Sequence, residues 1–407
     1  MWQIACRPPV NPDARKEGLG TKTWRGAQGL AEDVRWYGRW MRGEAERRIG
    51  MLYPKATLPD GSKATVVAWL WARTVTCPSP ACRASMPLVR SFWLSKKSGK
   101  EAWVNPVPET SDKRVRFEIG HGKGGPAVDA TVGRTGATCL VCSSPVPLEY
   151  IREEGRAGRI GEQLMAMVAE GNRQRVYLAP QSDHERAADV PRPEDVPDTE
   201  LPEQALGFRV QAYGMLHHAD LFTHRQLTAL CTFSDLVGEA RRRVCADSGG
   251  DAAYADAVAT FLALSVDRGA DLWNSLCSWN QTNQNIRALF SRQAVPMTWD
   301  FAELNTLLGG TGSFMGAIDW TAESIEGVAA GLGSTFGLGS QADATSQSFS
   351  AGKVISTDPP YYDAIPYSDL MDFFYVWLRR TLYGFSPELD AAFSEPLSPK
   401  WNHESQE

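Results

Sequence analysis

Four of the eight cysteines in this 407-residue chain form two close pairs. Cys77 and Cys82 have four residues between them, and Cys139 and Cys142 have two. Thiolates bind Zn²⁺ tetrahedrally, and a turn that carries two cysteines can present two sulfur ligands to one ion. The spacing therefore predicts a structural four-cysteine zinc site of the zinc-ribbon kind. Ordinary free thiols and a redox-active Cys-x-x-Cys pair are the alternatives.

A second chemically distinctive element is Asp358-Pro359-Pro360-Tyr361, which follows a short apolar run at residues 353–357. Two hydrogen-bond acceptors on the exocyclic amino group of a base draw its nitrogen towards sp³ geometry, and this frees the lone pair for methylation. The Asp358 carboxylate and the Pro359 carbonyl could supply these acceptors on a backbone that two prolines restrict. The Tyr361 ring offers a surface on which a flipped base can stack. A proline-stiffened turn is the alternative.

The elements that must hold these residues are expected to be both helical and extended. Apolar residues at three- and four-residue steps predict helices over 30–49, 156–170, 223–245, 252–266 and 368–383, with a short helical piece near 322–332. A β-rich module with all four paired cysteines is predicted over 64–150, with β-type runs at 65–71, 88–94, 101–107 and 115–119. Strands are also predicted at 176–180 and 353–357, and the second would place Asp358 at the carboxyl end of a parallel sheet.

Two glycine-rich stretches, 309–312 and 331–333, are candidates for a cofactor-binding loop. Such a loop follows a strand and opens a helix. Neither stretch is predicted to lie in that context, so both are interpreted as ordinary loops.

The charge of the chain is unevenly distributed. Residues 1–180 hold 28 Lys and Arg against 17 Asp and Glu, a net charge of +11, whereas residues 181–407 hold 14 against 31, a net charge of −17. The sign changes near an acidic, Pro-rich linker, and the basic half favours contact with DNA. The longest strongly apolar run, 66–72, is far shorter than the ~20 residues of a membrane helix. We expect a cytoplasmic protein with no membrane partner.

Six segments together resemble the family of adenine-specific DNA methylases that contain a zinc ribbon. They span about residues 29–383 and comprise 29–38, 86–94, 137–142, 220–227, 297–303 and 356–363. The resemblance implies an α/β fold in which an incomplete Rossmann-like methyltransferase core is interrupted by a β-rich zinc-ribbon module. It also implies S-adenosylmethionine-dependent methylation of DNA at adenine N6, with Zn²⁺ as a structural metal and a catalytic loop formed by Asp358, Pro359, Pro360 and Tyr361.

The expected domains follow from this resemblance and from the changes in composition. They are an irregular N-terminal segment (1–29), a helical segment of the core (30–63), the zinc-ribbon-like module (64–150), a helix with the acidic linker (151–207), a core portion with the Asp-Pro-Pro-Tyr loop (208–385) and a tail (386–407).

The cofactor-binding residues are left unassigned. The family carries an Asp-Pro-Phe-x-Gly-Gly-Gly type loop for S-adenosylmethionine before the region that matches residue 29, and residues 1–28 contain no such loop. The 46 residues after Tyr361 contain none either. We therefore expect a fragment or one piece of a split protein, truncated at both ends, with a second polypeptide supplying the half that binds S-adenosylmethionine.

Two other functions stay open at this stage. The chain could be a non-enzymatic, zinc-containing protein that binds DNA or assembles a complex through its basic half. Alternatively, the same loop chemistry could serve an amino group of RNA or of a protein glutamine, because it suits any planar amino group.

Overall fold

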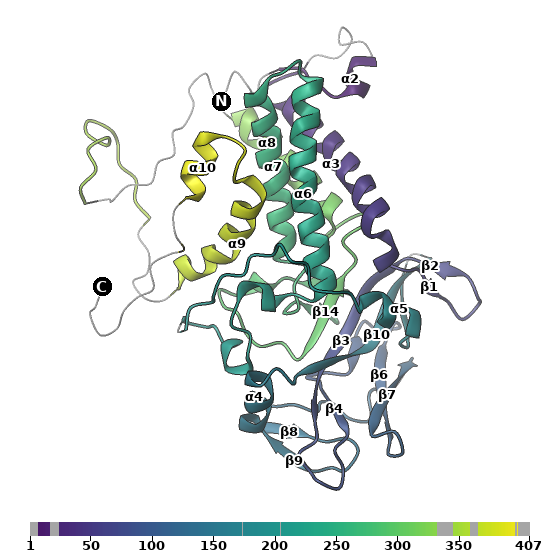
Figure 1. Cartoon of the computed structure of the whole chain (residues 1–407). Helices are drawn as coiled ribbons and strands as arrows, with labels where there is room; N and C mark the ends of the chain where they lie inside the picture. The colour runs from purple at the N-terminus through teal and green to yellow at the C-terminus, as the bar shows by residue number, and fades with distance from the viewer. Residues whose placement is uncertain are drawn as a thin grey trace.

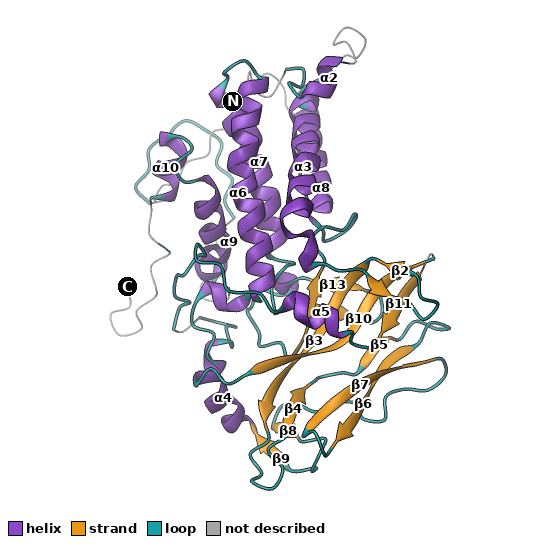
Figure 2. Cartoon of the chain, turned by 45° about the vertical axis from the view of Figure 1, so that its right-hand side comes forward, coloured by secondary structure: helices purple, strands orange, loops and turns teal. Residues whose placement is uncertain are grey.

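Helices gather at one end of the molecule and strands at the other (Figures 1 and 2). The computed structural model describes residues 7–16, 24–172, 174–203, 205–331, 345–358, 365–394 and 397. The described helices are α2 (Pro12–Lys16), α3 (Gln28–Ile49), α4 (Leu148–Arg156), α5 (Ser182–Ala188), α6 (His224–Asp247), α7 (Ala252–Ala270), α8 (Phe314–Gly331), α9 (Tyr367–Leu382) and α10 (Pro387–Phe393). Four short 3-10 turns accompany them: Gly50–Leu52, Gln211–Tyr213, His218–Leu221 and Leu289–Ser291.

The largest sheet is built around β3 (Val66–Thr76), which is buried at every position but the last. The strand order is β11 (Gln174–Leu178), β10 (Gly161–Gly171), β3 and β14 (Asp300–Leu304), and β4 (Ser85–Leu88) pairs with the far end of β3. All of these pairs are antiparallel. Since β3 is covered on both faces, its residues 66–72 are continuously apolar and not alternating.

The remaining strands form four small antiparallel sheets. The three-stranded sheet joins β5 (Trp93–Ser95), β6 (Ala102–Glu109) and β7 (Arg114–His121). The three two-stranded sheets pair β1 (Ala56–Thr57) with β2 (Lys63–Ala64), β8 (Gly136–Thr138) with β9 (Pro145–Pro147), and β12 (Ser278–Asn280) with β13 (Asn285–Arg287).

The predicted α/β class is confirmed in its coarse form: helices and strands are mixed, and four cysteines cluster. The parallel, Rossmann-like sheet is not found among the described residues, where every strand pair is antiparallel. A parallel sheet needs helices on both faces. Here α3, α6, α7 and α8 pack together in one helical group.

Two predicted elements are wrong. The segment predicted to be helical over 156–170 contains β10, in which residues 164–169 are all buried. The run 353–357 forms no strand, and all its residues are exposed. By contrast, the helices predicted over 30–49, 223–245, 252–266 and 368–383 are confirmed as α3, α6, α7 and α9.

Ion pairs join the helices on their half-buried sides. Arg35 on α3 forms a bidentate pair with Glu326 on α8, and Arg48 on α3 forms another with Glu239 on α6. The fully buried Asp33 of α3 accepts a hydrogen bond of 2.6 Å from the Tyr254 hydroxyl on α7. These contacts fix α3 between its neighbours, because a buried carboxylate is tolerated only where donors satisfy it.

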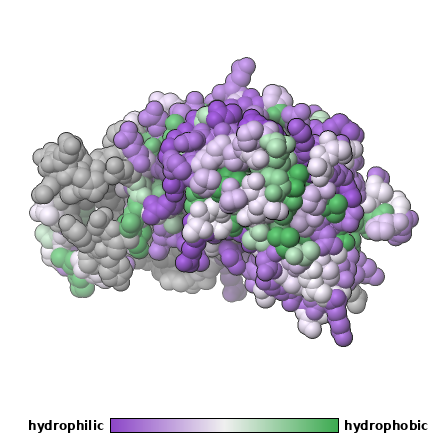
Figure 3. Space-filling model, turned by 90° about the horizontal axis from the view of Figure 1, so that it is seen from below, coloured by the Kyte–Doolittle hydropathy of each residue, from purple (hydrophilic) through white to green (hydrophobic). Residues whose placement is uncertain are grey.

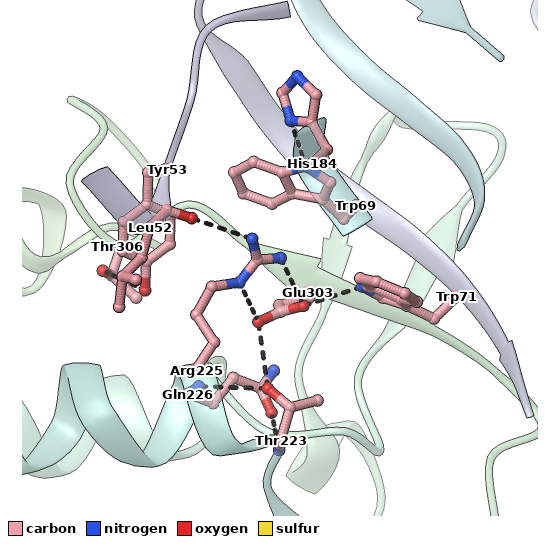
Figure 4. Close-up of polar contacts among 10 residues, drawn as sticks. All are labelled: Leu52, Tyr53, Trp69, Trp71, His184, Thr223, Arg225, Gln226, Glu303 and Thr306. Carbon is pink, nitrogen blue, oxygen red and sulfur yellow. Dashed lines mark hydrogen bonds and ion pairs between the residues drawn. The ribbon is translucent and has the colours of Figure 1, made fainter. Parts of the chain in front are cut away.

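The helical group is joined to the sheet by a buried ion pair (Figure 4). Arg225, in the first turn of α6, donates from Nε and Nη2 to the two carboxylate oxygens of Glu303 on β14, at 2.9 and 2.8 Å. The side-chain exposures are 0% and 2%, so neither charge is screened by water. Glu303 also accepts from Trp71 Nε1 and the Thr223 hydroxyl, and Arg225 donates to the Leu52 carbonyl.

Aromatic rings pack around the Arg225–Glu303 pair. The Arg225 guanidinium lies 4.3 Å from the centre of the Trp69 ring. Trp69 Nε1 in turn donates to Nδ1 of His184, at 2.9 Å, so the neutral His184 ring carries its proton on Nε2. His184 is fully buried, and burial lowers the pKa of this imidazole below its usual value. A second positive charge beside Arg225 would be unfavourable.

No described helix is long and apolar enough to cross a membrane. The face seen from below the strand-rich end is mostly hydrophilic, with small apolar areas between polar side chains (Figure 3).

We predict that breaking the Arg225–Glu303 pair on one side is far more costly than replacing both residues. Glu303→Leu leaves a buried, unpaired guanidinium and should lower the free energy of unfolding by about 3–5 kcal/mol. The double variant Arg225→Met with Glu303→Leu should recover much of this loss, because no buried charge remains. Urea unfolding followed by circular dichroism measures both. Equal stability of Glu303→Leu and the wild type would contradict the assignment.

We predict that His184 makes stability fall at mildly acidic pH. The imidazole is protonated below pH ~6.5 in the unfolded chain, whereas burial opposes its protonation in the folded chain. Because the unfolded state then binds more protons, the free energy of unfolding decreases as the pH falls. His184→Asn keeps an acceptor for Trp69 and cannot titrate. Between pH 7.5 and 5.5, urea unfolding should show a smaller loss of stability for this variant than for the wild type. Parallel pH profiles would refute the role of His184.

Candidate metal centre and the Asp358 loop

The four predicted metal ligands come together at the strand-rich end. Cys77 follows β3 directly and Cys82 precedes β4, whereas Cys139 and Cys142 lie in the turn between β8 and β9. Sγ of Cys77 is 3.7 Å from Sγ of Cys142, and Sγ of Cys82 is 3.9 Å from Sγ of Cys139. All four sulfur atoms lie within 4.8 Å of one another. Two turns distant in sequence therefore present one sulfur cluster.

The two turns that carry the cysteines have the same backbone hydrogen bond and a matching left-handed residue. The N–H of Cys77 donates to the Ala84 carbonyl at 2.8 Å, and the N–H of Cys139 donates to the Ser144 carbonyl at 3.0 Å. The residue after the second cysteine of each turn is left-handed, with φ of 56° at Arg83 and 60° at Ser143. Non-glycine residues seldom adopt this conformation. Its occurrence at matching positions indicates that each turn is shaped to direct two sulfur atoms to one point.

The sulfur separations fit a tetrahedral zinc site. With Zn–S bonds of about 2.3 Å, a tetrahedron has S–S edges of about 3.8 Å. The 3.7 and 3.9 Å contacts match that edge, and 4.8 Å bounds the remaining pairs. Burial raises the pKa of the Cys77 thiol to about 12, whereas hydrogen bonding to Ser144 lowers the pKa of Cys142 to about 6. A divalent cation would favour the thiolate at all four positions.

Such an ion would have a structural and not a catalytic role. Four protein sulfurs complete a tetrahedral zinc shell and leave no position for water or substrate. Around the cluster lies a small separate core, formed by Val75, Ala84, Met86, Leu88, Val132, Ala137, Val146, Ile151 and Trp299 together with three of the cysteines. So small an apolar core gives little stability by itself, and a bound metal would supply the rest.

Of the predicted catalytic loop, the described residues include only Asp358. Asp358 is exposed, and Pro359, Pro360 and Tyr361 lie outside the described residues. The preceding run also faces solvent, with Val354 and Ile355 exposed by 101% and 66%. The Asp358 carboxylate is thus accessible to a substrate, but the predicted strand that would position it is not formed.

The glycine-rich stretch 309–312 has a context that the sequence did not predict. It lies between β14 and α8, so a strand precedes it and a helix follows. Gly310 and Gly312 have φ of 91° and 89°, which only glycine adopts readily. The stretch lines an open cavity of about 600 Å³ together with Lys97, Lys100 and Arg175.

This cavity does not fit S-adenosylmethionine. Three cations and one carboxylate, Glu170, line it. The cofactor carries a sulfonium cation, which a surplus of positive charge would repel. The second stretch, 331–333, lies outside the described residues after Gly331. No cofactor-binding residues are assigned from the described part of the chain.

A further cavity, of about 320 Å³, combines residue types that the sequence did not single out as a site. Arg90, Arg287 and Arg292 line it together with Trp279 and Asp300. Burial raises the pKa of Asp300 to about 7. The contributing residues are up to 210 positions apart, as in the hydrogen bond from the Arg90 backbone to Asp300. No spacing pattern in the sequence could have shown that these residues lie close together.

No protein-family model, no curated protein and no solved structure matches this chain. The site must therefore be interpreted from its own geometry.

We predict that the purified chain binds one zinc ion per molecule through the cysteine cluster. Cys82→Ser should lose most of the zinc and unfold at a lower temperature, because one of four sulfur ligands is removed. Cys245→Ser, a matched change at a half-buried cysteine outside the cluster, should keep both zinc and stability. Elemental analysis and thermal unfolding measure these two properties. Equal zinc content in both variants would exclude the cluster as the metal site.

Proposed function

We propose that this chain carries the amino-group-binding loop of an S-adenosylmethionine-dependent DNA adenine-N6 methyltransferase. The observation that carries the proposal is the sequence Asp358-Pro359-Pro360-Tyr361, in a chain that also has a four-cysteine cluster. The exposure of Asp358 supports it, because the carboxylate must reach a base that has left the duplex.

The chemistry assigned to this chain is to prepare the amino nitrogen. Asp358 would accept one amino hydrogen bond and the Pro359 carbonyl the other. Their pull localises the lone pair on nitrogen, and the carboxylate stabilises the positive charge that develops there. Tyr361 would stack on the flipped base and hold it in place. S-adenosylmethionine, when bound, supplies the methyl group.

The proposal also includes the rest of a methyltransferase core, which a partner would complete. The exposed Val354 and Ile355 would pair within a Rossmann-like parallel sheet once the residues that bind S-adenosylmethionine are present. A second polypeptide that supplies those residues is the partner we propose. The four-cysteine module would act as a zinc-held support near the DNA, consistent with the net charge of +11 on residues 1–180.

A second candidate is a non-enzymatic, zinc-containing protein that binds DNA or assembles a complex. The antiparallel sheet favours it, because a methyltransferase core of the Rossmann kind is parallel. In that case Asp358 would have no catalytic role, and DNA binding would fall steeply with salt whether or not S-adenosylmethionine is added.

We predict that Asp358→Ala abolishes methyl transfer without unfolding the chain. Removal of a preorganised acceptor should lower the rate at least ~100-fold. Transfer of a labelled methyl group from S-adenosylmethionine to DNA measures it, with and without an extract of the source cells. Asp112→Ala, at another exposed aspartate, is the control.

Retained transfer by Asp358→Ala would refute the catalytic assignment. Salt-sensitive DNA binding by a wild-type chain that transfers no methyl group under either condition would favour the second candidate.

A further inference from the structure

The cavity of about 320 Å³ lies between three parts of the chain that are distant in sequence. The zinc module, which comprises residues 64–150, contributes Arg90 and Ser91. The β12–β13 hairpin contributes Trp279 and its neighbours, and the run 287–300 forms the remaining wall. This volume lies at the lower end of the range for small-ligand sites, about 300–1,000 Å³.

Three arginines at this cavity have no ion-pair partner among the described residues. Arg90, Arg287 and Arg292 are all exposed. Some arginines elsewhere are neutralised by a carboxylate, as Arg35 is by Glu326 and Arg48 by Glu239, whereas these three converge on one cavity without such a partner in the described part of the chain. Guanidinium groups bind phosphate through two parallel hydrogen bonds. The unpaired charges therefore favour a phosphate-bearing ligand.

The interior offers groups suited to a nucleobase. The half-buried Trp279 ring is held by a hydrogen bond of 2.9 Å from Nε1 to the Leu94 carbonyl. Trp299, which also lines the cavity, is buried and packs edge-on against Tyr213. Asp300 also lines the cavity and accepts only backbone N–H groups among the described residues, from Arg90 at 2.8 Å and from itself. Indole rings stack on bases, and a carboxylate accepts from an amino group of a base.

The back wall of the cavity is fixed by a buried arginine on β3. Arg73 donates from Nε to the Thr298 carbonyl at 3.0 Å and from Nη2 to the Ser275 carbonyl and hydroxyl. Its backbone N–H also donates to the Trp299 carbonyl. The run that carries Thr298, Trp299 and Asp300 is thus held in place before any ligand arrives.

We propose that this cavity binds one unpaired nucleotide of a single-stranded nucleic acid. The arginines would hold the adjoining phosphates, Trp279 would stack on the base, and Asp300 would accept a hydrogen bond from an exocyclic amino group. The site is separate from Asp358, and it does not depend on methyl transfer. The preferred bases would be those that carry an amino group, such as cytosine over thymine.

The first test measures binding of fluorescein-labelled 12-nucleotide oligo-dC without S-adenosylmethionine. Arg287→Ala with Arg292→Ala should weaken binding about tenfold or more, and should reduce the salt dependence of log K by about 1.4 because two phosphate contacts are lost. Lys123→Ala with Arg134→Ala removes the same charge from exposed positions of the zinc module and should change binding less than ~3-fold. Equal weakening by both double variants would overturn the site.

The second test examines the base. Wild type should bind oligo-dC at least ~5-fold more tightly than oligo-dT, and Asp300→Ala, which removes the acceptor and is checked for retained zinc, should remove most of this preference. An unchanged preference would overturn the role of Asp300. Equal binding of duplex DNA would exclude an unpaired base, and dCMP binding as tightly as the oligonucleotide would assign the site to free nucleotides instead.

Discussion

The convergence of four sulfur atoms is the constraint on which the strand-rich end depends. Cys77 and Cys82 are held by one turn and Cys139 and Cys142 by another, and the core around them is small. Trp299 belongs to that core and also lines the cavity proposed for a nucleotide. A change that separates the four sulfur atoms would therefore disturb the lining of this cavity as well as the fold.

The central strand β3 connects the sulfur cluster to the rest of the molecule. Its far end leads into Cys77, its second half carries Arg73 behind the cavity, and Trp69 and the central Trp71 lie against the Arg225–Glu303 pair. One strand thus joins the sulfur cluster, the cavity and the helical group. Because β3 is covered on both faces, a change at any of these points acts on a packed interior that has little room to adjust.

The sequence predicted the local elements well where one face of each is apolar. The helices α3, α6, α7 and α9 and the cysteine cluster were expected from spacing alone. The segment with β10 was expected to be helical, because Leu164, Met167 and Val168 fit a helical step. All positions from 164 to 169 are buried, and periodicity cannot distinguish a strand buried on both faces from a helix. The Arg225–Glu303 pair and the arginine-lined cavity join residues far apart in sequence, and no local pattern could reveal them.

Zinc coordination by the four cysteines would link the fold to both proposals, since it would hold the module that carries Arg90 and support Trp299. The most direct measurement is the zinc K-edge X-ray absorption spectrum of the purified, full-length chain. The sulfur cluster predicts four sulfur neighbours at about 2.3 Å and no lighter ligand. Nitrogen or oxygen ligands in the first shell, or protein from zinc-supplemented cells that contains no zinc, would contradict it.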